Sequence, residues 1–410
     1  MTNYVNRMAN RAIYTPSVTP MYARLAVKSP TLVRNGVMPA GLTLNDLNFL
    51  DAGNSLFHID HVLYSAGQAM GPSHVPCMIT QRHGLSNKTT VIGDSGGYQL
   101  ISGVIPWQGD ATRRAVLHWL ETYCDVGMTL DVPTAAIGDP KSGFNTFSAC
   151  LTTTLKNLAF FQQHRKPGRI RLLNVLQGRD RNEANTWYDA VKAYPFEGWA
   201  FAGPLKLDFC EVLRRLITIR DEGNLNGKDW LHFLGTGTPE VACVLTSIQS
   251  ALRSNGFPDL KVTFDTSTPF SVVGLNKLVC AATKLSPNGV SQQFGHISDT
   301  RAYVGSQRRF PFDSAIGRLL KLGDICVNGA TFQNTTWDEL SQAMLCNHNV
   351  DYMLAGMDQV SCIYNLETRD AAQFLPAWLL EVKQIVPMVF ASQTPMGVIS
   401  RNKRFLTTLV

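Results

Sequence analysis

Residues 91–100 read Val91-Ile92-Gly93-Asp94-Ser95-Gly96-Gly97-Tyr98-Gln99-Leu100. An apolar pair runs into an aspartate, two glycines allow a sharp turn, and an aromatic ring follows at once. The pattern predicts a strand that ends at Asp94 and brings its carboxylate close to the Tyr98 ring, where a planar ligand could bind. On these ten residues alone an ordinary turn after a strand is the simpler interpretation. The rest of the sequence is therefore needed to distinguish a ligand site from an ordinary turn.

Short apolar runs alternate with longer amphipathic runs on both sides of this stretch. We expect eight strands, at residues 22–27, 61–65, 90–93, 128–130, 170–176, 198–202, 230–234 and 260–264. The amphipathic runs predict helices over 110–127, 146–164, 182–194 and 208–221, and one that begins at Thr238-Pro239 with Thr as the N-cap. This alternation predicts an α/β fold with a parallel sheet, and eight units predict a (β/α)8 TIM barrel. An open, doubly wound sheet is the alternative.

The alternation ends after Thr266. Residues up to about 335 are rich in loops and basic side chains, and helices are expected over 337–357 and 371–386. We expect residues 1–270 to form the barrel with the active site. Residues 271–410 would add an insertion and helices that pack on it, within one continuous domain.

The composition is that of a globular protein, with 45% hydrophobic and 17% charged residues. No apolar run approaches the roughly 18 residues that a membrane span needs, so we expect a cytoplasmic protein without a membrane partner. The nine cysteines are an odd number without a Cys-x-x-Cys pair, which favours reduced thiols over a disulfide framework. The net charge of +6 is compatible with a polyanionic partner. The oligomeric state stays open, a homo-oligomer included.

A polar residue or a glycine follows each of six consecutive predicted strands. These residues are Asp94, Asp131, Gln177, Gly203, Gly235 and Asp265. In a TIM barrel they would converge on the C-terminal face, where catalytic groups lie, although a single strand-end aspartate can equally cap a helix.

These residue types point to one kind of chemistry. The set has three carboxylates and contains no histidine or metal-ligand cluster, which argues against a Ser-His triad and against metal-assisted hydrolysis. Two carboxylates and a glutamine can accept hydrogen bonds from the N1–H and amino group of guanine. A third carboxylate can attack the anomeric carbon of a sugar and form a glycosyl ester. Base exchange is the reaction that uses both abilities.

Four short segments resemble the ordered motifs of the tRNA-guanine transglycosylase superfamily. They are Asp94-Ser95-Gly96-Gly97-Tyr98-Gln99, Leu176-Gln177-Gly178, Gly235-Thr236-Gly237-Thr238-Pro239-Glu240 and Phe264-Asp265. The resemblance covers roughly residues 55–270 and implies a pentosyltransferase that needs no redox cofactor.

The resemblance also implies a role for each matching position. Asp265 would be the nucleophile that attacks C1′, and Asp94 the general acid and base for the departing and incoming bases. The remaining matches would bind the base: Asp131, Gln177 and the backbone at Gly203 would hold a 7-deazaguanine, and Tyr98 and Leu234, next to Gly235, would form the two walls around it.

The chain departs from the tRNA enzymes after the expected nucleophile. Those enzymes have a segment rich in Pro, Thr and Arg that grips the anticodon loop, whereas this chain has Ser267-Thr268-Pro269-Phe270-Ser271-Val272-Val273. The segment after Gly203 also differs, as Pro204-Leu205-Lys206. These departures resemble the DNA-guanine transglycosylases (DpdA-type) of phages and bacteria, which exchange guanine in DNA for a 7-deazaguanine such as preQ0. A tRNA enzyme and a catalytically silent nucleic-acid-binding relative are the alternatives.

The family's structural zinc requires four ligands, and the sequence does not show a complete set. We expect no zinc. Asp324, Cys326, Cys346 and His348 are the fallback ligands, with simple burial as the alternative for the cysteines.

A nucleic-acid substrate needs phosphate contacts near the active site. The first candidates are Arg301, Arg308, Arg309, Arg318 and Lys321, and Arg401, Lys403 and Arg404 form a second set. The basic run 164–169 joins a helix to the next strand, so we expect a solvated loop on the opposite face of the barrel.

Overall fold

The computed structural model describes residues 2–3, 10–69, 76–82, 89–328 and 335–409. Eight parallel strands form its central sheet: β2 (Ile13–Pro16), β4 (His61–Ser65), β5 (Thr90–Asp94), β6 (Val126–Met128), β7 (Arg171–Leu176), β8 (Gly198–Phe201), β9 (Trp230–Phe233) and β10 (Lys261–Thr266). From β4 to β10 each strand pairs with the next along the chain, and β10 pairs with β2. A parallel bridge between Ser17 and Leu63 joins the remaining edges. The sheet is a nearly closed barrel, which confirms the TIM-barrel prediction against the open sheet.

Strand alternation separates the barrel interior from its outer face. Side chains on alternate positions point inward, and a distinct apolar cluster fills the interior with Leu63, Ile92, Val126, Met128, Leu173, Val175, Ala200 and Trp230. The residues between them belong to the larger core under the surrounding helices. The same period carries the inner face of β5, β7 and β10 onward to Asp94, Gln177 and Asp265.

The surrounding helices begin at well-formed caps. They are α4 (Asp110–Tyr123), α5 (Phe147–His164), α6 (Arg181–Val191), α7 (Phe209–Asp221) and α8 (Pro239–Ser254). Asp180 caps α6 and Asp208 caps α7, because each carboxylate accepts a hydrogen bond from the first turn. Thr238 caps α8 in front of Pro239, as predicted.

The predicted strand at 22–27 is wrong. The first barrel strand is β2, and residues 22–25 lie in helix α1 (Pro20–Leu25). Pro20 suits the first helical turn because it lacks an N–H, and Tyr22, Ala23 and Leu25 are buried at helical spacing. The predicted strand at 128–130 is displaced, since β6 ends at Met128 and Asp131 lies three residues beyond it.

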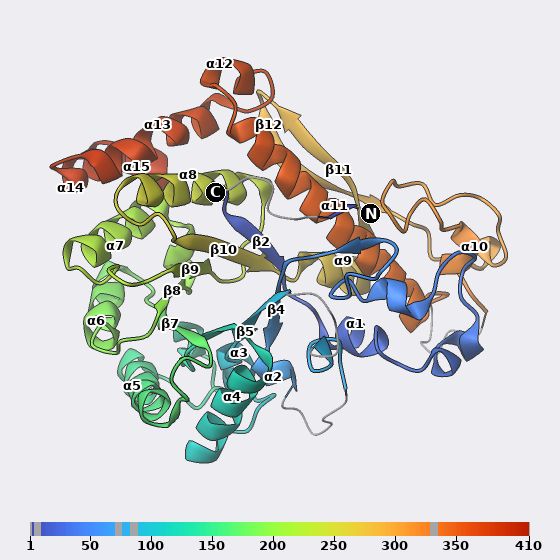
Figure 1. Cartoon of the computed structure of the whole chain (residues 1–410), viewed down its shortest axis with the longest axis horizontal. Helices are drawn as coiled ribbons and strands as arrows, with labels where there is room; N and C mark the ends of the chain where they lie inside the picture. Colours follow the sequence, from blue (N-terminus) through green and yellow to red (C-terminus); the bar gives the residue numbers. More distant parts are fainter. Residues whose placement is uncertain (1, 4–9, 70–75, 83–88, 329–334, 410) are drawn as a thin grey trace.

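The C-terminal part is helical and packs on the barrel (Figure 1). Helix α9 (Thr268–Asn276) and the hairpin β11 (Leu278–Ser286) and β12 (Gly289–His296) occupy a region where only loops were expected. The long helix α11 (Glu339–Tyr364) contacts α1, α8, α9 and β2, so it fills the eighth helix position between the last and first strands. Helix α13 (Ala377–Ala391) packs on α8.

Short elements complete the fold. The strands are β1 (Thr2–Asn3) and β3 (Phe57–His58), and the helices are α2 (Ala66–Ala69), α3 (Gly97–Ile101), α10 (Leu322–Ile325), α12 (Thr368–Ala371), α14 (Pro395–Arg401) and α15 (Lys403–Thr407). The 3-10 turns are η1 (Pro30–Leu32), η2 (Arg34–Gly36), η3 (Leu44–Leu47), η5 (Thr134–Ala136), η6 (Pro204–Leu207) and η7 (Arg301–Tyr303). Across the described ranges, none of the helices has the length and apolar character to span a bilayer.

Candidate active site

Three carboxylates and one amide meet at the C-terminal end of the barrel. Asp94 is the last residue of β5, Gln177 directly follows β7, and Asp265 is the fifth residue of β10. Asp131 reaches the same place from the loop after β6, since it bonds Gln177. The structure therefore brings together the four polar strand-end residues that the sequence singled out.

None of the three carboxylates is a helix N-cap. The N-cap positions of the following turns are Gly96 before α3, Pro133 before η5 and Ser267 before α9. The helix-capping interpretation of these aspartates is therefore wrong. The aspartates that cap α6 and α7, Asp180 and Asp208, lie further from the strand ends.

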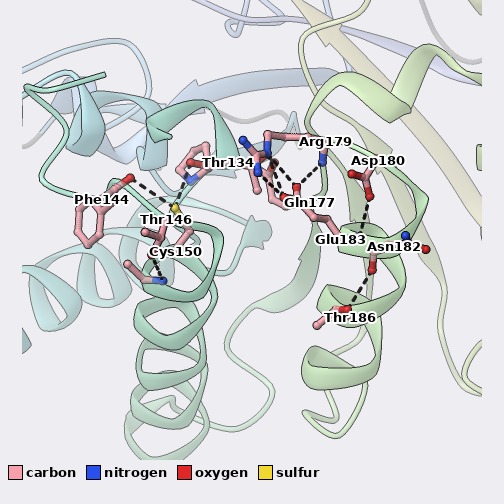
Figure 2. A network of polar contacts seen from close by, with 12 residues as sticks. Thr134, Phe144, Thr146, Cys150, Gln177, Arg179, Asp180, Asn182, Glu183 and Thr186 are labelled. Carbon is pink, nitrogen blue, oxygen red and sulfur yellow. Dashed lines mark hydrogen bonds and ion pairs between the residues drawn. The ribbon is translucent and has the colours of Figure 1, made fainter. Parts of the chain in front are cut away.

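Asp131 and Gln177 form a buried pair. The Gln177 Nε2 donates to Asp131 Oδ2 at 2.8 Å. Thr134 Oγ1 donates to Gln177 Oε1 at 3.3 Å, and both of these residues are labelled in Figure 2. These bonds fix the orientation of the amide. The pKa of Asp131 is raised to about 7, mainly by burial and in addition by the neighbouring Asp94 carboxylate, while the hydrogen bond from Gln177 opposes the shift.

Two glycines let backbone approach this pair closely. A Cβ on Gly203 would lie 2.9 Å from Gln177 Oε1, and the φ of Gly203 is +69°. A Cβ on Gly97 would lie 2.8 Å from the Asp131 carbonyl oxygen and 3.1 Å from its Oδ1. Any side chain at either position would displace the groups expected to bind the base, so both positions require glycine.

Asp265 is held by one of its two oxygens. The backbone N–H of Gly235 donates to Asp265 Oδ1 at 2.7 Å, and His232 Nε2 lies 3.2 Å from the same oxygen. Gly235 has a φ of +61°, in the left-handed region that favours glycine. Among the described residues, every hydrogen bond to Asp265 ends at Oδ1, so Oδ2 remains available for chemistry.

His232 corrects the expectation that no histidine joins the acidic groups. It is fully buried, and its Nδ1 lies 2.7 Å from Thr263 Oγ1, which also accepts a hydrogen bond from Trp230 Nε1 at 2.8 Å. A chain of polar contacts thus runs from Trp230 through Thr263 and His232 to Asp265. The sequence signal was the alternation of β9, which puts positions 230, 232 and 234 on its inner face. His232 lies within β9 and not directly after it, so the pattern of residues that follow the strands does not include it.

Asp94 is partly buried and its pKa is raised. Burial is the main cause and the Asp265 carboxylate adds to it, while hydrogen bonds from the Ser65 hydroxyl and the Gly96 N–H oppose the shift. Asp94 therefore holds a proton at higher pH than an ordinary aspartate, as a general acid requires.

The two expected walls of the base pocket differ in exposure. Tyr98 lies on α3 with 67% of its surface exposed, so its ring is available for stacking. Leu234 is half-buried and packs against the cluster that fills the barrel interior. Stacking of a base between them stays a prediction.

The fallback zinc ligands have other partners. Asp324 Oδ2 accepts a hydrogen bond from the backbone of Lys321, and the Cys326 and Cys346 thiols lie near the carbonyl oxygens of Ser298 and Phe270. His348 uses both nitrogens, with Nδ1 2.7 Å from Ser314 Oγ and Nε2 2.8 Å from the Cys280 carbonyl oxygen. In the part of the chain that the structure describes, no group of three such side chains is placed to hold a metal ion. The residues present do not fit a tetrahedral zinc site.

The first set of phosphate-contact candidates is exposed to solvent. Its members are Arg301, Arg308, Arg309, Arg318 and Lys321. Of these, Arg318 pairs with Asp313 and Arg308 lies over the Tyr303 ring.

The other two basic segments lie apart from each other. Arg401 ends α14 and Lys403 and Arg404 lie in α15; both helices pack on α7. The loop 164–169 joins the end of α5 to the start of β7, at the N-terminal end of the barrel, where Arg165 pairs with Glu197.

No known protein-family model matches the chain, and a search of curated proteins found no significant match.

Proposed function

We propose that the protein is a base-exchange transglycosylase that replaces guanine in DNA with a 7-deazaguanine such as preQ0. One observation carries the proposal: a buried aspartate with one anchored and one free oxygen lies at the strand ends that also present Asp94 and the Asp131–Gln177 pair. This set combines a nucleophile, a proton donor and acceptors for a purine edge.

In this proposal Asp131 and Gln177 bind the base. A guanine presents N1–H and its amino group as donors, which an ionised Asp131 accepts. Gln177 offers both an acceptor oxygen and donor hydrogens, and Thr134 and Asp131 hold its amide in place. The 7-deazaguanine has the same donor edge, so one site serves both the leaving and the incoming base.

The covalent step belongs to Asp265. Its free Oδ2 attacks C1′ of the deoxyribose, the bond between C1′ and N9 breaks, and its electron pair stays on the guanine. In its protonated form, Asp94 gives its proton to the leaving base. The incoming base then loses its N9 proton to Asp94, N9 attacks C1′, and the Asp265 ester breaks. Proton and charge balance over the two half-reactions, and no redox cofactor is involved.

His232 positions the nucleophile. Its Nε2 and the Gly235 N–H both point to Oδ1, which keeps Asp265 in one rotamer and directs Oδ2 to the sugar. The hydrogen bond between Nδ1 and Thr263 fixes the ring in turn. His232 contacts neither base nor sugar in this scheme.

DNA is proposed over tRNA because the segment after Asp265 lacks the arginines with which the tRNA enzymes grip the anticodon loop. Here it is apolar, and Pro269, Phe270 and Val273 are buried in α9. The base must leave the stack to reach Asp265, so the enzyme would flip it or act on opened DNA.

Mass spectrometry of nucleosides tests the proposal. The protein is expressed in cells that are supplied with a 7-deazaguanine. Their DNA and tRNA are then digested to nucleosides separately. A 7-deaza-2′-deoxyguanosine in the DNA fraction that is lost with Asp265→Ala supports it. The modified nucleoside in tRNA alone would overturn the DNA assignment, and its absence from both would overturn base exchange.

A further inference from the structure

A cavity of about 210 Å³ lies outside the barrel wall, between β7 and β8 on one side and α6 and α7 on the other. Its floor is apolar and includes Leu176, Phe201 and Val212. A wider hollow shares Arg181 and Leu205 with it and continues to Lys403 of α15. The two form one surface from the strand ends to the C-terminal helices, which lie beside α7 in Figure 1.

Positive charge dominates the rim of the cavity. Arg181, Lys206, Arg214 and Arg215 line it together with one acidic residue, Glu211. Glu211 is shared, because it pairs with Arg181 and also lies 3.9 Å from Arg214 Nε.

Arg214 and Arg215 also have neutral partners. Arg214 bonds Ser400 Oγ at 3.0 Å, and Arg215 bonds Asn185 Oδ1 at 2.6 Å and lies over the Tyr188 ring. Lys206 has no hydrogen-bond or ion-pair partner among the residues that the structure describes. Burial lowers the pKa of both Lys206 and Arg215, so an anion entering the cavity would relieve desolvated charge.

The inner end of the cavity borders the candidate active site. Gln177 belongs to both, since its amide bonds Asp131 and its side chain lines the cavity. Lys206 Nζ lies 3.3 Å from the position of a Cβ on Gly235, whose N–H holds Asp265. A strand whose base is bound at Asp131 and Gln177 would thus pass the mouth of this cavity.

We propose that the cavity binds a phosphodiester group of the nucleic-acid strand next to the exchanged nucleotide, with Lys206, Arg214 and Arg215 as its cationic contacts. The inference rests on the proposed function, because it takes the ligand to be a strand. Drug-sized ligands occupy roughly 300–1,000 Å³. The cavity is smaller, so its volume suits a phosphodiester group and not a larger ligand. The apolar floor would face the sugar.

Fluorescence anisotropy with a labelled single-stranded DNA of about 12 nucleotides tests this on the full chain. One double variant, Arg214→Gln/Arg215→Gln, removes two cations of the cavity. The matched control is a second double variant, Lys166→Gln/Arg169→Gln, which removes two exposed cations at the opposite end of the barrel. Thermal unfolding of each variant checks folding, and Arg214→Gln alone serves as a milder second variant.

We expect the cavity variant to bind DNA at least about tenfold more weakly and the control to change less than about twofold. Two lost phosphate contacts would also flatten the slope of log K against log salt by about 1.4, from about 0.7 per contact on a single strand. An unchanged affinity and slope in a folded cavity variant would overturn the inference.

Two further arms separate the possible ligands. Guanosine monophosphate that displaced the strand with equal affinity would make the cavity a small-molecule site and overturn the inference. An RNA of the same sequence bound more tightly than DNA would overturn DNA as the strand. Formation of the covalent Asp265 adduct is measured separately. If the adduct forms normally and the cavity variant binds DNA with unchanged affinity, the inference about the cavity fails but the proposed function stands.

Discussion

Asp131→Asn is expected to stabilise the fold while it weakens base binding. Asp131 is buried with 5% of its surface exposed, and burial raises its pKa from 3.8 to about 7. The folded protein therefore binds a proton that the unfolded chain releases between about pH 4 and pH 7. In that window the free energy of unfolding falls as pH rises. Above it Asp131 is ionised, and the buried carboxylate destabilises the fold by its full amount.

The magnitude follows from the shift. A difference of about 3 pKa units at 1.36 kcal/mol each gives roughly 4 kcal/mol as an upper limit. The amide of the variant keeps an acceptor for Gln177 but loses part of the hydrogen bonding, at about 1 kcal/mol. We expect the variant to be about 2–3 kcal/mol more stable than the wild type near pH 8, and equal to it or slightly less stable near pH 4.

Urea unfolding followed by tryptophan fluorescence measures the free energy of unfolding across this range. Calorimetric titration with free guanine then gives base affinity, which should fall by at least about tenfold near pH 8, where the wild-type carboxylate accepts from the base. A variant that is less stable than the wild type at both pH values would refute the claim that the buried Asp131 carboxylate destabilises the fold. Unchanged base affinity would refute Asp131 as a base-binding residue.

Three further substitutions probe the neighbouring groups. His232→Leu should slow adduct formation by about 10–100-fold with an unchanged KM, and His232→Gln should recover part of the rate; a change in KM alone would contradict a positioning role. Gly203→Ala should weaken base binding by about 1–3 kcal/mol, since its Cβ would lie 2.9 Å from Gln177 Oε1; equal binding would mean that the glycine is not required. Tyr98→Ala should weaken base binding by about 1–3 kcal/mol and DNA binding less, and equal losses would indicate that the ring only packs.

Strand alternation explains what the sequence could predict. The β5 and β10 runs carry Asp94 and Asp265 on the inner face of a barrel whose strands β4 to β10 were expected from periodicity. Asp131 was expected directly after its strand but lies three residues on, because β6 ends at Met128, two residues earlier than expected. It reaches the site through its bond with Gln177.

Other features depend on contacts between distant residues. The strand expected at 22–27 is a helix because its apolar residues meet the C-terminal part of the chain; Tyr22, for example, packs its ring against Phe270. His232 sits inside an apolar strand, and only its neighbour Thr263 on β10 and the Asp265 carboxylate distinguish it from a core residue. Local pattern does not encode such pairings.

Trapping the covalent intermediate tests the central claim most directly. The protein is mixed with labelled DNA, denatured, digested and analysed by peptide mass spectrometry. The proposed mechanism predicts a deoxyribose-linked adduct on the peptide that contains Asp265, released by added 7-deazaguanine and absent from Asp265→Ala. An adduct on another residue, or base exchange that persists in Asp265→Ala, would contradict it.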